Sequence, residues 1–170
     1  MLKWVGALLV VGGGTALGLE AAGRLTTRVR CLSSLLRAEE WMERELSFRL
    51  TPVPALLESI AARTSPPIRG LFCSCVSHMR ELGEKSFGEL WREAVRETGL
   101  PLKEDERQAV CSLGDILGRF DAEGQCVALR EGAAELREYL RRAEQERDRL
   151  CRVYTTLGVG SSLLLVILLI

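Results

Sequence analysis

The chain has apolar ends and a polar middle. Residues 4–22 contain no lysine or arginine and one acid, Glu20, and residues 153–170 carry no charge. An α-helix rises about 1.5 Å per residue, so each stretch nearly crosses a hydrocarbon core of roughly 30 Å. The pattern predicts one transmembrane helix over residues 1–23 and another over residues 153–170. The first stretch also fits a cleavable signal peptide, with Lys3 ahead of it, and that alternative stays open.

Between the ends, in residues 24–152, apolar residues recur every three or four positions, which is the period of an amphipathic helix. The sequence therefore predicts an all-α fold, a six-helix antiparallel bundle flanked by N- and C-terminal transmembrane helices. The six helices are expected at about 24–50, 54–63, 67–82, 87–98, 103–117 and from 121 into the second apolar end. Their expected buried residues include Leu32, Leu36, Leu46, Leu57, Ile60, Phe72, Cys75, Met79, Leu82, Trp91, Val110, Leu113 and Leu117.

Helix-ending and helix-starting residues support this division. Proline fits the first turn of a helix but not its interior, and glycine favours a helix end. Ser86 and Glu89 have the spacing of a capping box, in which each side chain accepts a hydrogen bond from a free backbone amide. The residues at the predicted boundaries are Pro52, Pro54, Pro66, Pro67, Gly83, Ser86, Gly99, Gly118 and Asp121.

The last helix carries a heptad pattern from Cys126 to Tyr154, with apolar residues at alternating steps of three and four. Charges alternate in sign over residues 135–152, which suits either a surface for a partner helix or a solvated stalk. Within the apolar ends, Gly14 to Gly18 and Gly158 to Ser162 are small-xxx-small patterns that permit close helix packing.

The distribution of arginine predicts the orientation in the membrane. Arginines follow the first apolar stretch at positions 24, 28 and 30 and precede the second at positions 141, 142, 147, 149 and 152. Basic flanks stay cytoplasmic, so residues 24–152 are expected to face the cytoplasm. Overall, 23 lysines and arginines balance 23 acids, so no net field favours nucleic acid. Cysteines of a cytoplasmic domain are expected to be reduced thiols.

The sequence shows no pattern of catalytic, cofactor-binding or metal-ligating residues. We therefore predict no catalytic site, no cofactor, no metal site and no small-molecule substrate. The triplet at residues 12–14 lacks the Lys-Ser/Thr that follows the glycines of a phosphate loop. Cys75 and His78 could share one helix face, but no further ligand has suitable spacing for zinc. The acids Glu39 and Glu40, and the acids at 104–106, are expected on solvated faces or in first turns.

Several segments together resemble the stage III sporulation protein AB family of endospore-forming bacteria. They are the opening MLKWVGALLVVGGGTALG, TPVPALLESIA from residue 51, FGELW at 87–91, SLGDILGRFDAEGQ at 112–125 and the closing VYTTLGVGSSLLLVILLI. The resemblance implies a soluble part like the helical domain of the F-type platform protein of type II secretion and type IV pilus systems. It implies no catalytic residues.

The same resemblance implies a role in the channel between mother cell and forespore. The protein would lie in the mother-cell-derived outer forespore membrane, in contact with lipid. Its expected partners are the sporulation secretion-type ATPase (stage III sporulation protein AA) and other membrane subunits of the channel. We therefore expect a non-enzymatic membrane platform, with its docking residues between positions 51 and 101. The alternatives are a membrane-tethered adaptor or signalling coil, and a small enzyme using the thiols of Cys73 or Cys75.

Overall fold

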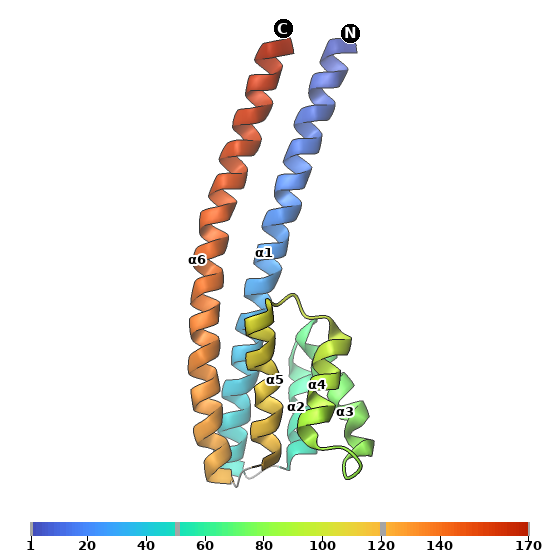
Figure 1. The fold of residues 1–170 in the computed structure, drawn as a ribbon, viewed down its shortest axis with the longest axis vertical. Helices are drawn as coiled ribbons and strands as arrows, with labels where there is room; N and C mark the ends of the chain where they lie inside the picture. Colours follow the sequence, from blue (N-terminus) through green and yellow to red (C-terminus); the bar gives the residue numbers. More distant parts are fainter. Residues whose placement is uncertain (1, 50–51, 120–121, 170) are drawn as a thin grey trace. The chain divides into compact units, whose positions relative to one another are not determined.

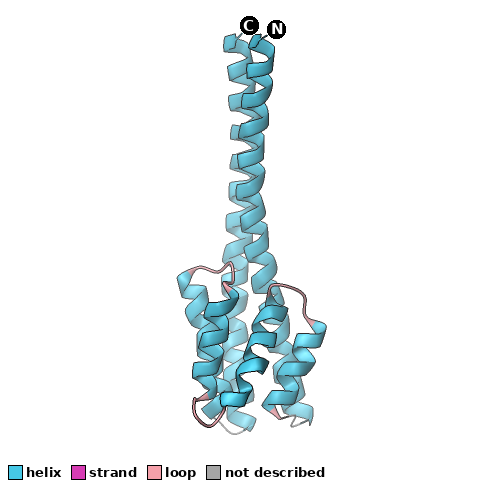
Figure 2. Ribbon diagram, turned by 90° about the vertical axis from the view of Figure 1, so that its right-hand side faces the viewer, coloured by secondary structure: helices cyan, strands magenta, loops and turns pink. Residues whose placement is uncertain are grey.

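The computed structural model describes residues 2–49, 52–119 and 122–169, and these ranges form six α-helices, one 3₁₀-helix and no β-strand (Figure 1). The elements are α1 (Leu2–Arg49), α2 (Val53–Arg63), α3 (Ile68–His78), η1 (Met79–Glu81), α4 (Phe87–Thr98), α5 (Glu104–Arg119) and α6 (Ala122–Leu169). Figure 2 shows the same elements coloured as helix and loop. The all-α fold with six helices is thus confirmed for these residues. Asp121, the predicted cap of α6, lies outside them.

The chain divides into two compact units. The first, Arg30–Arg141, contains the end of α1, all of α2 to α5 and the start of α6, and we call it the helical domain. Within it successive helices run antiparallel, α4 packs against α3 and α5, and α2 packs against α3 (Figure 1). The largest fully buried side chains of its core are Trp91, Phe72, Leu32, Met42, Leu56, Leu57, Ile60, Ile68, Leu71, Leu90, Leu129 and Leu136.

The second unit, Met1–Val29 with Arg142–Ile170, contains the remaining parts of α1 and α6, and we call it the terminal unit. Arg28 on α1 and Glu146 on α6 form an ion pair there, with 2.7 Å between Nη1 and Oε2. Among the described residues, no helix long and apolar enough to cross a membrane was found. Most side chains of the two predicted spans, those of residues 2–19, 155, 157–159 and 161–169, lie outside the described part of the structure.

The third helix is shorter than predicted. It ends at His78 and continues as the single turn η1, after which Leu82 adopts an extended conformation with ψ 120°. Gly83 follows with φ +113°, a conformation that side chains strongly disfavour. The chain therefore leaves the helix before Leu82, which is 49% exposed and was wrongly predicted to be buried.

The predicted start and end of α4 are confirmed. The backbone amide of Glu89 donates to Ser86 Oγ (3.3 Å), and the amide of Ser86 donates to Glu89 Oε2 (2.8 Å). These hydrogen bonds lower the pKa of Glu89, with the backbone amide of Ser86 as the largest cause. Gly99 ends the helix in the left-handed conformation, with φ 57°. α5 has a related cap that the sequence analysis missed, because the amide of Lys103 donates to the carboxylate of the fully buried Glu106 (2.9 Å).

Trp91 on α4 occupies the centre of the helical domain and is fully buried. Its Nε1 donates a hydrogen bond to the carbonyl oxygen of Val110 on α5 (2.7 Å), and its ring centroid lies 5.6 Å from that of Phe72 on α3. Gly114 is what lets the indole approach α5, since a Cβ at that position would lie 2.6 Å from Trp91 Cβ. One side chain thus holds three helices together.

Replacing Gly114 with alanine is expected to cost about 1 to 3 kcal/mol through overpacking against Trp91. Alanine normally gains roughly 1 kcal/mol over glycine inside a helix, so the free energy of unfolding should fall by up to about 2 kcal/mol. The matched control is Gly70→Ala on α3, where the nearest foreign atom, Thr98 Cγ2, would lie 3.4 Å away. That variant should be neutral or slightly stabilised. Denaturant unfolding of the full chain in detergent, followed by tryptophan fluorescence, compares the two, and equal effects would contradict the packing argument.

Candidate functional site

Two of the segments that carry the family resemblance meet at the start of α4. Arg92 on α4 forms an ion pair with Asp115 on α5, with 2.5 Å between Nη2 and Oδ1, and Gly88 lies directly against the same carboxylate. A pocket of about 360 Å³ lies there, lined by Ser86, Phe87, Gly88, Glu89, Arg92, Gly114 and Asp115. Because the arginine and the aspartate neutralise each other and Glu89 caps its own helix, this cluster joins α4 to α5 and offers no poised acid, base or nucleophile.

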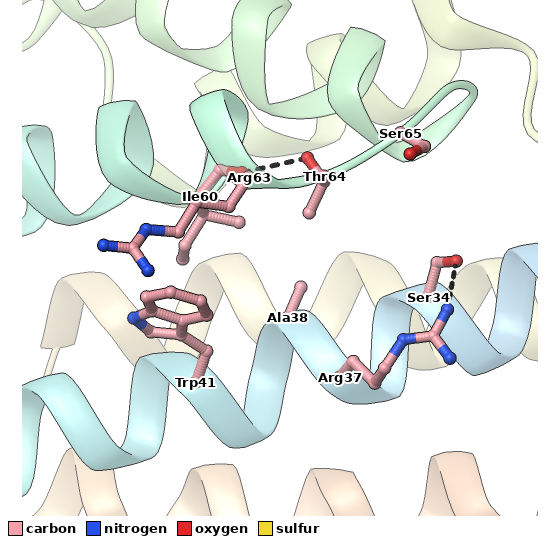
Figure 3. Close-up of a pocket in the computed structure, with 8 residues that line it drawn as sticks. All are labelled: Ser34, Arg37, Ala38, Trp41, Ile60, Arg63, Thr64 and Ser65. Carbon is pink, nitrogen blue, oxygen red and sulfur yellow. Dashed lines mark hydrogen bonds between the residues drawn. The ribbon is translucent and has the colours of Figure 1, made fainter.

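A second pocket, which we call the α1–α2 groove, lies between α1 and the end of α2 (Figure 3). It has a volume of about 270 Å³ and is lined by Ser34, Arg37, Ala38, Trp41, Ile60, Arg63, Thr64 and Ser65. Ala38 and Ile60 are buried at its base, while the arginine and serine side chains surround it. The groove therefore combines a small apolar base with cationic and hydroxyl groups.

Both arginines of the groove are held by uncharged neighbours. Arg37 donates hydrogen bonds to Ser33 Oγ (3.1 Å) and Ser34 Oγ (3.0 Å) on its own helix. Arg63 lies over the indole of Trp41, with its Cζ 4.2 Å from the ring centroid (Figure 3). Neither guanidinium has a carboxylate partner among the described residues.

Another face of α1 in the helical domain shows the opposite arrangement. Glu40 pairs with Arg137 of α6 (2.6 Å), and Glu43 pairs with Arg130 of α6 (2.7 Å). These two acids of α1 thus pair with arginines of α6, and the positive charges of the groove have no carboxylate partner among the described residues.

Half of this groove lies in the segment predicted from the sequence. The range 51–101, predicted for docking, includes Ile60 to Ser65, but the half contributed by α1 was missed. The spacing of the lining residues on α1 could have indicated this half. Steps of three, one and three positions separate Ser34, Arg37, Ala38 and Trp41, so these residues share one helix face.

The thiols proposed for an enzymatic alternative differ in exposure. Cys73 is exposed and Cys75 is buried, and burial raises the pKa of the Cys75 thiol to about 12. Burial also raises the pKa of Cys31 to about 12. Because the thiolate is the reactive form, Cys31 and Cys75 are not set up as nucleophiles. His78 Nε2 lies 3.6 Å from Glu97, and the described ranges contain no group of three potential metal ligands.

Comparison with known proteins identifies the family. The profile described as stage III sporulation protein AB matches residues 3–170. The chain belongs to the stage III sporulation protein AB family. It is 29% identical over 171 residues to stage III sporulation protein AB of Bacillus subtilis (strain 168), and the alignment covers 99% of each protein. A solved structure of a stage III sporulation protein AB shares the fold, with a TM-score of 0.66 at 23% identity over 72% of this chain and 98% of that one.

This member of the stage III sporulation protein AB family contains a buried carboxyl group that the sequence analysis wrongly placed on a solvated face. Glu39 is 0% exposed, and neither of its carboxyl oxygens has a hydrogen-bond partner. Gly132 on α6 lies directly against it, since a Cβ built there would collide with Glu39 Oε1, and the same Cβ would lie 3.2 Å from Leu113 Cδ2 on α5. Glu39 and Glu40 are neighbours along the chain, but only the second reaches an arginine.

Burial raises the pKa of Glu39 to about 8, and the charge of Arg137 offsets only part of this effect. The folded protein therefore binds a proton more tightly at this position than the unfolded chain, whose carboxyl keeps its ordinary pKa of 4.5. Stability should fall as the pH rises from about 4.5 to about 8 and then level off. One pKa unit corresponds to about 1.4 kcal/mol, so the total loss is roughly 3 to 5 kcal/mol.

Replacing Glu39 with glutamine should remove this contribution to the pH dependence, because the amide does not titrate. The measurement is the free energy of unfolding of the full chain in a neutral detergent at pH 5, 6.5 and 8. Glu58→Gln serves as the control, since Glu58 is exposed and its removal should leave the slope unchanged. A slope that persists in Glu39→Gln and disappears in Glu58→Gln would contradict the assignment.

Proposed function

We propose that this chain is a non-enzymatic, membrane-anchored platform subunit of a sporulation assembly that links mother cell and forespore. The observation that carries the proposal is the family match over residues 3–170, which includes both apolar ends together with the helical domain. The relatives are named as sporulation proteins, and none of their names describes an enzymatic activity. A protein of this kind holds other subunits in place rather than transforming a substrate.

The membrane part of the proposal rests on hydropathy and charge. The apolar ends at 1–23 and 153–170 act as two transmembrane anchors, and the arginines that flank them keep residues 24–152 on the cytoplasmic side. The anchors lie in the mother-cell-derived outer forespore membrane. Both termini then lie on the far side of that membrane, and the helical domain is available to cytoplasmic partners.

The proposed partners are a sporulation secretion-type ATPase on the cytoplasmic side and other channel subunits in the membrane. Support comes from the resemblance to platform proteins of secretion systems and from a groove with uncompensated positive charge. A platform without catalytic groups needs an external energy source, which a bound ATPase supplies. A membrane-tethered adaptor or signalling coil would need the two long helices but not α2 to α5. Because these four helices form a packed core, that alternative has less support.

The first test is complementation in Bacillus subtilis lacking its own stage III sporulation protein AB. The full chain is expected to restore heat-resistant spores, whereas versions lacking residues 1–23 or 153–170 should restore few, because the domain is then held at the membrane by one anchor instead of two. Immunoblots confirm that each version accumulates, and restoration by a form lacking both ends would refute the anchored platform.

The second test is topology, measured by labelling of single cysteines with an impermeant maleimide. A background with all six native cysteines replaced must first restore sporulation, which it does if no thiol has a chemical role. In non-sporulating cells that carry the chain in the cell membrane, a cysteine at Ser65 is then expected to label only after lysis, and one added after Ile170 should label in the intact protoplast. Labelling of the Ser65 position from outside would place the helical domain on the wrong side for an ATPase.

A further inference from the structure

We infer that the α1–α2 groove is the docking site for an acidic helical segment of a cytoplasmic partner, which binds through two carboxylates about two helical turns apart. The inference deepens the proposed platform function and rests on it. It names the chemistry of the partner and the residues that recognise it. The carboxylates would pair with Arg37 and Arg63.

The two guanidinium groups of the groove determine the chemistry of the partner. Arginine recognises carboxylates through a planar fork of donors, which forms strong charge-assisted hydrogen bonds. In the groove each fork is already oriented, Arg37 by the hydroxyls of Ser33 and Ser34 and Arg63 by the face of Trp41. These contacts with uncharged groups leave the positive charge uncompensated within the described chain. Less conformational entropy is therefore lost when an acid binds.

The spacing of the two groups sets the spacing of the acids. Arg37 reaches back to the level of Ser34, whereas Arg63 covers Trp41, seven positions further along α1 (Figure 3). Seven helical residues correspond to roughly 10 Å. Two acidic residues at i and i+7 of a helix laid along the groove match this separation. An apolar residue between them at i+3 or i+4 would face the buried base formed by Ala38 and Ile60.

The composition of the groove favours a protein partner over a lipid surface. Recognition of anionic lipid by charge typically uses a cluster of four to eight basic residues. The groove has two arginines, a half-buried tryptophan beneath one of them and an apolar base, and arginine and tryptophan are enriched among residues that dominate protein interfaces. Ser65 adds a hydroxyl that has no hydrogen bond to another described side chain.

The test is peptide binding to the purified full chain in a neutral detergent, measured by fluorescence anisotropy. The probe is an alanine-based helical peptide with glutamates at i and i+7 and leucine at i+4. Matched peptides carry glutamine in place of both glutamates, or glutamates at i and i+2. We expect binding of the first peptide that weakens with salt, and at least about tenfold weaker binding of both matched peptides.

Variants of the protein locate the site. Arg37→Gln and Arg63→Gln should each weaken binding about tenfold, because each removes one charge-assisted pair. Arg80→Gln is the matched control, since Arg80 is an exposed arginine outside the groove, and its affinity should equal that of the unchanged protein. Both groove arginines have exposed side chains, and circular dichroism confirms that the variants keep their helix content.

Two results would overturn the inference. The groove does not bind paired carboxylates if the glutamate and glutamine peptides bind equally. The same conclusion follows if Arg80→Gln loses as much affinity for the peptide as the groove variants do. Displacement of the peptide by glycerol phosphate at comparable concentration would assign the groove to lipid headgroups instead. Because peptide binding is measured on the isolated protein and spore formation in cells, failure of the groove and failure of the platform function are distinguishable.

Discussion

The helical domain depends on the contact between the indole of Trp91 and the backbone of α5. The hydrogen bond from the indole to the carbonyl of Val110 satisfies a buried donor that would otherwise be costly, and Gly114 provides the space for the ring. Phe72 on α3 packs against the same indole, so this ring contact positions α3 against α4. Since α2 packs on α3, the position of one wall of the α1–α2 groove follows from this contact as well.

The elements themselves could be predicted because their signals are local. Proline and glycine at the boundaries, the capping box of Ser86 and Glu89, and the three- and four-residue apolar period all act within a few residues. Leu82 is the residue for which the apolar period gave a wrong prediction. Leu82 continues the apolar period of α3, but the conformation at Gly83 turns the chain away and leaves it exposed.

The candidate site could be predicted only in part, because it depends on contacts between distant segments. Ser34 and Ser65 line one groove although about thirty positions separate them, and no spacing rule relates α1 to α2. Glu39 and Glu40 look alike in sequence, yet helix packing buries one carboxyl and pairs the other with Arg137. Gly132 was the only hint, since a glycine inside a heptad pattern indicates that another group approaches the helix closely.

The buried carboxyl group of Glu39 also changes the net charge of the folded protein. Composition gives 23 positive and 23 negative side chains, hence a formal net charge of +0. With a pKa of about 8, Glu39 is mostly uncharged at neutral pH in the folded protein and ionised in the unfolded one. The native form is therefore close to one unit more cationic than its sequence implies, and its isoelectric point lies above that of the same chain in urea.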